Sequence, residues 1–166
     1  MTACYATGNV TGDYSVGGVV GLVTGSASNI TACYSTGNVT ATGEGGSAGG
    51  VVGSNNDGST VTACYHATGT VSGPNATIGG VAGYSDNITT ACYWGSNPAT
   101  GIGYILGGIG GDATKVDGTD VTWQIAQSGM NEAIETWNDG NPNKQCNWRY
   151  AETDAETPPT LEPVNN

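Results

Sequence analysis

A four-residue phrase, Thr-Ala-Cys-Tyr, occurs four times along the chain, and no other feature restricts the fold as strongly. The copies begin at Thr2, Thr31, Thr62 and Thr90. The cysteines of successive copies are 29, 31 and 28 residues apart. A chain that returns the same letters at a nearly fixed period is typical of stacked structural repeats, whereas a disordered chain has no such requirement. The phrase therefore predicts an array of copies of one unit.

A second phrase, rich in glycine, accompanies the first. It reads Gly-Gly-Val-Val-Gly or a variant, and its copies begin at Gly17, Gly49, Gly79 and Gly107. Residues 1 to 121 are also dense in Thr and Asn and almost empty of Leu, Glu, Lys and Arg, which excludes helical repeats. Short strands with Gly-rich corners would make each copy one coil of a solenoid. We expect an all-β fold, a parallel β-helix of about four coils over residues 1 to 121.

Each coil is expected to contain three short strands. They are centred on the Thr-Ala-Cys-Tyr phrase, on a Gly-Asn-Val-Thr phrase such as Gly8 to Thr11, and on the Gly-Gly-Val-Val-Gly phrase. Stacking places equivalent residues about 4.8 Å apart, so that repeated cysteines and tyrosines form ladders. Which ladder points inward stays open, because the extra residue in Thr89-Thr90 breaks the alternation of the fourth copy.

The composition changes after residue 121, where the chain becomes rich in tryptophan. Val121, Trp123 and Ile125 alternate with polar residues and predict a strand. A helix is expected over about residues 129–138, where apolar residues recur at helical spacing: Met130, Ala133, Ile134 and Trp137. A second strand is expected around Trp148.

Residues 122 to 151 would thus form a small C-terminal cap with one short helix. Such a cap is expected because the last coil of a solenoid exposes apolar interior and unpaired strand groups. The remaining residues, 152 to 166, are acidic and contain proline, and are expected to form a loosely attached tail.

The charge of the chain is strongly one-sided. It has 14 acidic and three basic residues and a net charge of −11, and residues 1 to 111 contain none of the basic residues, which are Lys115, Lys144 and Arg149. This balance argues against a nucleic-acid partner, because phosphates would be repelled. No apolar run approaches the ~20 residues of a membrane span. The N-terminus does not resemble a signal peptide and starts inside a repeat phrase, so that either an export signal has been removed or the chain is a fragment of a longer one. The start inside a repeat phrase favours a fragment, with the rest of the chain N-terminal to Met1.

The Gly-Gly-Val-Val-Gly phrase, the strand ending in Cys-Tyr and the following Thr-Gly-Asn-Val together resemble the GLUG repeat. This repeat occurs in secreted and surface-anchored bacterial proteins, including the N-terminal regions of IgA-specific metallopeptidases. The resemblance covers roughly residues 2 to 111. It implies a right-handed β-helix, a secreted or cell-surface location and often an adhesive role, and it carries over no catalytic residues. The fourth copy departs from the pattern, since the stretch from Trp94 to Pro98 replaces Thr-Gly-Asn-Val.

The candidate reactive side chains show no catalytic pattern. The five cysteines lack the spacing of a zinc site, and stacked cysteines suit disulfide geometry poorly, so buried free thiols are expected, with a bridge as the alternative. His66 is the sole histidine, and its counterparts in the other copies are Ala6, Ser35 and Trp94. We expect neither an enzyme nor a cofactor. The alternative is part of a polysaccharide-processing enzyme or an accessory region of a secreted protease, which would need an acid/base pair.

The repeat tyrosines are the best candidates for ligand binding. They are Tyr5, Tyr34, Tyr65 and Tyr93. Stacked, they would form an aromatic column that either serves as a platform for a host glycan or surface protein, or belongs to the core. The sequence thus predicts a non-catalytic repeat module that acts as an adhesion segment, a stalk or a binding segment.

A weaker candidate is a calcium site between the repeats and the cap. Its carboxylates would come from Asp112, Asp117 and Asp120. Their spacing differs from that of the calcium-binding loop, so a solvated turn is the alternative and no other metal site is expected.

Overall fold

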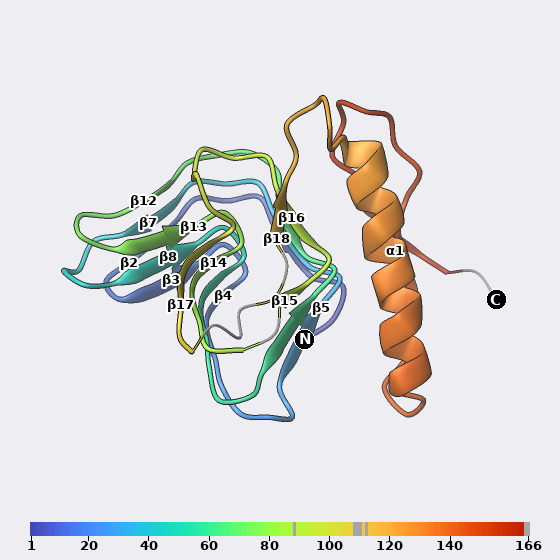
Figure 1. Ribbon diagram of the computed structural model, residues 1–166, viewed down its shortest axis with the longest axis horizontal. Coiled ribbons are helices and arrows are strands. Elements are labelled where there is room, and N and C mark those ends of the chain that lie inside the picture. The colour runs from blue at the N-terminus through green and yellow to red at the C-terminus, as the bar shows by residue number, and fades with distance from the viewer. Residues whose placement is uncertain (88, 108–110, 112, 165–166) are drawn as a thin grey trace.

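The computed structural model describes residues 1–87, 89–107, 111 and 113–164. In this part of the chain, short parallel strands stack into five sheets, and a helix lies beside them (Figure 1). Within each of the five sheets, equivalent strands of successive coils pair with one another. The chain therefore winds as a parallel β-helix, as predicted.

Each sheet takes one strand from each coil that it passes through. Sheet A contains β5 (Asn29–Thr31), β10 (Thr60–Thr62) and β15 (Thr89–Thr90). Sheet B contains β1 (Tyr5–Ala6), β6 (Tyr34–Ser35), β11 (Tyr65–His66), β16 (Cys92–Trp94) and β18 (Ala113–Lys115). Sheet C contains β2 (Val10–Gly12), β7 (Val39–Ala41) and β12 (Val71–Ser72). Sheet D contains β3 (Ser15–Gly17), β8 (Ser47–Gly49) and β13 (Thr77–Gly79). Sheet E contains β4 (Val20–Val23), β9 (Val52–Asn55), β14 (Ala82–Ser85) and β17 (Ile102–Ile105).

A full coil therefore has five short strands, and the prediction of three strands per coil is wrong. Two of the phrases that read as single strands each contain a corner. The first corner lies inside Thr-Ala-Cys-Tyr, whose alanine has a positive φ in every copy, for example 53° at Ala32 and 52° at Ala63. This left-handed conformation, which costs a non-glycine residue ~1–2 kcal/mol, turns the chain from sheet A into sheet B.

The corner decides which ladder points inward. Cys64 packs inside the solenoid with Val61 and Val81, whereas Tyr65 belongs to a separate cluster on the outside. The amide of Cys33 donates to the Sγ atom of Cys64 over 3.4 Å, and the Cys64 thiol donates to the carbonyl of Thr62 over 3.2 Å. The repeated cysteines thus satisfy backbone groups at the corner, and all five cysteines are free thiols, as predicted.

The second corner is the Gly-Gly-Val phrase, which joins sheet D to sheet E. These two sheets lie against each other with almost no space between their backbones. A Cβ atom on Gly53 would come within 2.4 Å of the backbone nitrogen of Val16, and one on Gly49 within 1.9 Å of the carbonyl oxygen of Val52. Glycine recurs here because a side chain at either position would push the two sheets apart.

In the fourth coil this corner occurs earlier than predicted. Ile102 pairs with Ala82, so the corner lies at Gly101 and not in the phrase from Gly107 to Gly111. The prediction is wrong because sheets C and D, as far as the chain is described, end at β12 and β13, so that the fourth coil is shorter. Residues 108–110 of the predicted copy lie outside the described residues.

A column of unlike residues fills the interior beside the cysteines. Sheet B aligns Ser35, His66 and Trp94 in successive coils. The second glycine of the Gly-Gly-Val phrase makes room for each one: a Cβ on Gly50 would lie 2.4 Å from the His66 ring, and one on Gly80 would lie 2.2 Å from the Trp94 ring. The column can therefore vary in size from coil to coil while the glycine opposite stays constant.

Helix α1 (Trp123–Gly140) runs alongside the stack, next to sheets A and B (Figure 1). The C-terminal region, called the cap below, therefore covers one side of the coils and not, as predicted, the open end of the last coil. It begins at Thr122, whose hydroxyl accepts from the amide of Ile125 over 3.3 Å. The prediction of a strand from Val121 to Ile125 is wrong. The N-cap and the helical spacing of the buried residues favour a helix more strongly than the short alternation of apolar and polar residues favours a strand. Those buried residues are Trp123, Ala126, Met130 and Ile134. In the described part of the chain, no helix combines the length and the apolar character of a membrane span.

The C-terminal residues belong to the fold. The strand expected around Trp148 is present as β19 (Trp148–Tyr150), and it pairs in antiparallel fashion with β20 (Leu161–Pro163). The hydroxyl of Tyr65 donates to the carbonyl of Pro159, which is itself buried. The prediction of a loosely attached tail is therefore wrong for residues 152 to 163, because apolar residues within this acidic stretch pack against the repeats.

Candidate functional site

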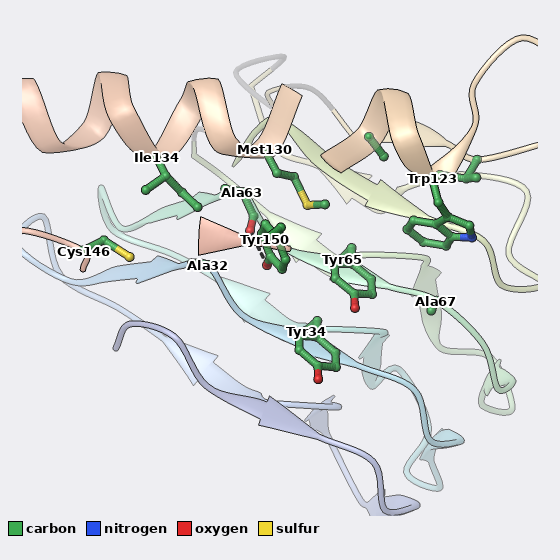
Figure 2. Close-up of a cluster of buried hydrophobic side chains, with 12 residues drawn as sticks. Ala32, Tyr34, Ala63, Tyr65, Ala67, Trp123, Met130, Ile134, Cys146 and Tyr150 are labelled. Atoms are coloured by element: carbon green, nitrogen blue, oxygen red, sulfur yellow. Dashed lines mark hydrogen bonds between the residues drawn. The ribbon is translucent and has the colours of Figure 1, made fainter. Parts of the chain in front are cut away.

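The repeat tyrosines form the expected column, but most of it is covered. The rings of Tyr5, Tyr34 and Tyr65 stack with centroid separations of 5.1 and 4.8 Å and nearly parallel planes. Tyr5 is 63% exposed, whereas Tyr34 is 8% and Tyr65 is 1% exposed. Figure 2 shows the cause: α1 and β19 bring Met130, Trp123 and Tyr150 over the column.

Hydrogen bonds and ring contacts attach the cap to this column. The Tyr150 hydroxyl donates to the carbonyl of Ala63 over 2.8 Å, and the rings of Tyr150 and Trp123 lie 5.5 and 5.2 Å from that of Tyr65. Burial raises the pKa of both Tyr65 and Tyr150. Tyr34 and Tyr65 are therefore core residues that hold the cap, and they cannot serve as an exposed platform in this arrangement. Tyr93 is partly buried against the same cluster.

The aspartates proposed for calcium do not converge on a site in the described residues. Asp117 accepts from the amides of Thr119 and Val121 over 2.9 and 3.0 Å, and these bonds lower the pKa of its carboxyl. Asp120 is exposed, and Asp112 lies outside the described residues. Across the described ranges, no group of three or more His, Cys, Asp or Glu side chains is placed to hold a metal ion. Asp117 thus stabilises the turn that precedes α1.

His66 is fully buried inside the solenoid. Its Nδ1 atom lies 2.9 Å from the Oγ of Ser35, whose hydroxyl donates to the carbonyl of Gly50. Its Nε2 atom has no hydrogen-bond partner in the described structure, and burial lowers the pKa of His66 to about 4. The imidazole is therefore neutral at neutral pH and serves as a core residue, because it has no contact with solvent.

A different set of tyrosines lines an open groove over sheets D and E. This tyrosine groove has a volume of about 430 Å³ and is lined by Tyr14, Tyr84 and Tyr104 together with Ser, Thr, Asn and Gly residues. Tyr84 on β14 and Tyr104 on β17 stack with their ring centroids 5.6 Å apart and an angle of 16° between planes. Tyr14, which precedes β3, is 70% exposed and Tyr104 is 48% exposed.

Hydroxyl groups form the floor of the tyrosine groove. The Oγ of Ser54 lies 3.0 Å from that of Ser15 and 2.6 Å from that of Ser47, so the two sheets are joined by side-chain hydrogen bonds at this point. Thr77 extends the same row, and Asn56 lines the groove nearby. The Oδ1 atom of Asn56 is buried and has no hydrogen-bond partner in the described part of the chain.

The surroundings of the groove are acidic. Partial desolvation and the carboxylates of Asp86 and Asp57 raise the pKa of Tyr84. No Lys or Arg occurs before Lys115. The residues that line the groove include no carboxylate and no imidazole in the described structure, so the groove offers aromatic rings and hydroxyl groups but no acid/base pair.

The sequence prediction missed this groove because its tyrosines do not recur in every copy. A weak signal was present. Tyr84 and Tyr104 each directly follow the last glycine of the corner phrase, at Gly83 and Gly103. Their pairing in sheet E could be predicted only once the fourth corner was placed at Gly101.

A comparison with known proteins supports the repeat. The family model of the GLUG motif matches residues 12–40, which run from the end of β2 in the first coil to β7 in the second and include both corner phrases. No curated protein and no solved structure shows a significant match to the chain. The chain thus contains a GLUG motif at residues 12–40, and the phrases of this motif recur in register in the following coils.

Proposed function

We propose that the chain is a non-catalytic binding module of a secreted or cell-surface bacterial protein, and that the tyrosine groove is its contact surface. The location and the adhesive role are those implied by the GLUG repeat. The single observation that carries the proposal is the stacked pair Tyr84 and Tyr104, which stands open beside a row of hydroxyl groups.

Rigidity supports this role. The groove lies on sheets D and E, whose backbones are in contact and whose serines bond across the interface. Aromatic residues held on such a frame lose little conformational entropy when a partner binds, so contact area converts efficiently into affinity. Exposed tyrosines are also typical anchors of binding surfaces.

Adhesion of protein-coated beads to intact cells tests the proposal. We expect the double variant Tyr84→Ala/Tyr104→Ala to lose most of the adhesion shown by the original chain. Tyr5→Ala is the control, because Tyr5 is also an exposed ring but lies in the other column. Equal adhesion by the double variant would contradict the proposal. So would release of reducing sugars from polysaccharides incubated with the chain.

A further inference from the structure

The tyrosine groove contains a vacant position in an otherwise bulky column. Sheet E aligns Leu22, Ser54, Tyr84 and Tyr104 in successive coils. Leu22 and Tyr104 are about half exposed and point outward, whereas Ser54 is 6% exposed and lies at the floor of the groove, bonded to Ser15 and Ser47. Only the second coil has a small residue at this position, and one face of the Tyr84 ring is therefore left without a stacked neighbour on that side.

The size of the gap follows from the spacing of the coils. Two coil spacings separate Leu22 from Tyr84, which amounts to roughly 9–10 Å. A single ring placed midway would lie about 4.8 Å from each neighbour, close to the 4.8 Å at which Tyr34 and Tyr65 stack. The gap between Leu22 and Tyr84 is therefore wide enough for one ring of a ligand.

Polar groups around the gap indicate the kind of ring. The hydroxyls of Ser15, Ser47 and Ser54 form the floor of the groove, and Asn56 lines it nearby. A pyranose ring has an apolar face for Tyr84 and hydroxyl groups around its edge for these partners. An aromatic side chain of a protein would stack equally well, but it would leave the serine row unmatched.

The negative charge near the groove favours neutral sugars over acidic ones. Asp86 and Asp57 lie close enough to Tyr84 to raise the pKa of its hydroxyl, and residues 1 to 114 contain no Lys or Arg to offset them. Uronate and sialate groups would be repelled, whereas neutral sugars would not.

The geometry points to a neutral glycan as the ligand, with one pyranose ring seated in the gap above Ser54 and stacked on the free face of Tyr84. This assignment rests on the proposed function and specifies its ligand. Tyr14, which also lines the groove, is the residue that we assign to the neighbouring sugar of the glycan.

Binding to an array of neutral oligosaccharides and their uronate counterparts tests the assignment, with affinities of the hits measured by calorimetry. We expect neutral hits only, and about tenfold or greater weakening in Ser54→Tyr, which fills the gap. Tyr5→Ala is the control, because Tyr5 is an exposed ring outside the groove and its removal should leave affinity within about twofold. The large side chains of Leu22 and Tyr84 at this register show that the position tolerates bulk. If Ser54→Tyr fails to fold by circular dichroism, Ser54→Leu fills the gap with the residue of the first coil.

Three outcomes would overturn the glycan assignment: no neutral hit, a preference for uronates, or affinities that Ser54→Tyr and Ser54→Leu leave unchanged. The proposed function is judged separately. If Tyr84→Ala/Tyr104→Ala abolishes adhesion to cells while no oligosaccharide binds, the groove is a contact surface for a protein and only the glycan assignment fails.

Discussion

The protein contains two tyrosine columns that differ in almost every respect except stacking. In the column of Tyr5, Tyr34 and Tyr65, the residues come from the repeat phrase, the rings are nearly parallel, and the cap buries two of the three. In the pair of Tyr84 and Tyr104, the residues fall outside the recurring letters and the rings stay accessible.

The difference shows what repetition signifies in this fold. A residue that recurs in every coil occupies a position with the same structural constraint in each of them. Examples are the left-handed corner at Ala32 and the close backbone contact at Gly53. A surface position freed from such requirements can change from coil to coil, as the series from Leu22 to Tyr104 does. Recurring residues therefore indicate structure, and local departures on the outer face indicate candidate binding sites.

Tyr65→Ala should lower stability more than the other substitutions that we propose. A small effect would contradict the view that the covered tyrosine column is structural and the open pair is not. Tyr65 is 1% exposed and contacts Tyr34, Trp123 and Tyr150. Removing a large buried aromatic ring costs about 3–5 kcal/mol of unfolding free energy. Urea denaturation followed by tryptophan fluorescence measures the change. A loss below about 1 kcal/mol would mean that the cap does not depend on the covered column.

The sequence predicted the repeat, its parallel stacking and the GLUG resemblance, because these follow from recurring letters. It could not predict the corner at Ala32, because alanine rarely adopts a positive φ and nothing local requires it. The orientation of cysteine and tyrosine depended on that corner. The start of α1 was misplaced because the alternation from Val121 to Ile125 competed with a helical pattern that began in the same residues.

The candidate site was harder to predict than the fold. The tyrosine groove depends on which residues of sheets D and E become neighbours, and that depends on the length of the fourth coil. Similarly, nothing in the phrase around Tyr65 indicates that residues some 60 to 90 positions later, Trp123 and Tyr150, pack against it. Such long-range contacts leave no periodic trace in a single sequence.

His66 also differs from its counterparts in the other coils, but it is buried inside the solenoid. The pH dependence of stability tests whether such a buried difference has a structural effect only. An unfolded histidine has a pKa near 6.5, and burial lowers that of His66 to about 4 in the folded chain. Between these values the unfolded state binds a proton that the folded state does not, so stability falls as the pH falls. The loss reaches about 3 kcal/mol near pH 4.

Denaturation curves at pH 7, 5.5 and 4 measure this loss. His66→Ser is the matched control, because it introduces the residue that Ser35 provides in the preceding coil. The variant lowers stability at every pH through its cavity, but its decline between pH 6.5 and 4 should be smaller than that of the original chain. Equal declines would show that His66 takes up a proton in the folded state as easily as in the unfolded one.

Tyr84→Ala and Tyr104→Ala should have the smallest effect on stability. Tyr104 is 48% exposed and Tyr84 is partly exposed, and their stacking contributes about 1 kcal/mol. Because either substitution removes this stacking, we expect each to lower the unfolding free energy by about 1 kcal/mol or less, measured by the same urea series as Tyr65→Ala. A loss comparable with that of Tyr65→Ala would show that the pair of Tyr84 and Tyr104 is structural. Its exposure would then no longer support a role in binding. A negligible loss leaves a stacked, solvent-facing pair that the fold does not require, which is the condition under which a surface can be occupied by a ligand.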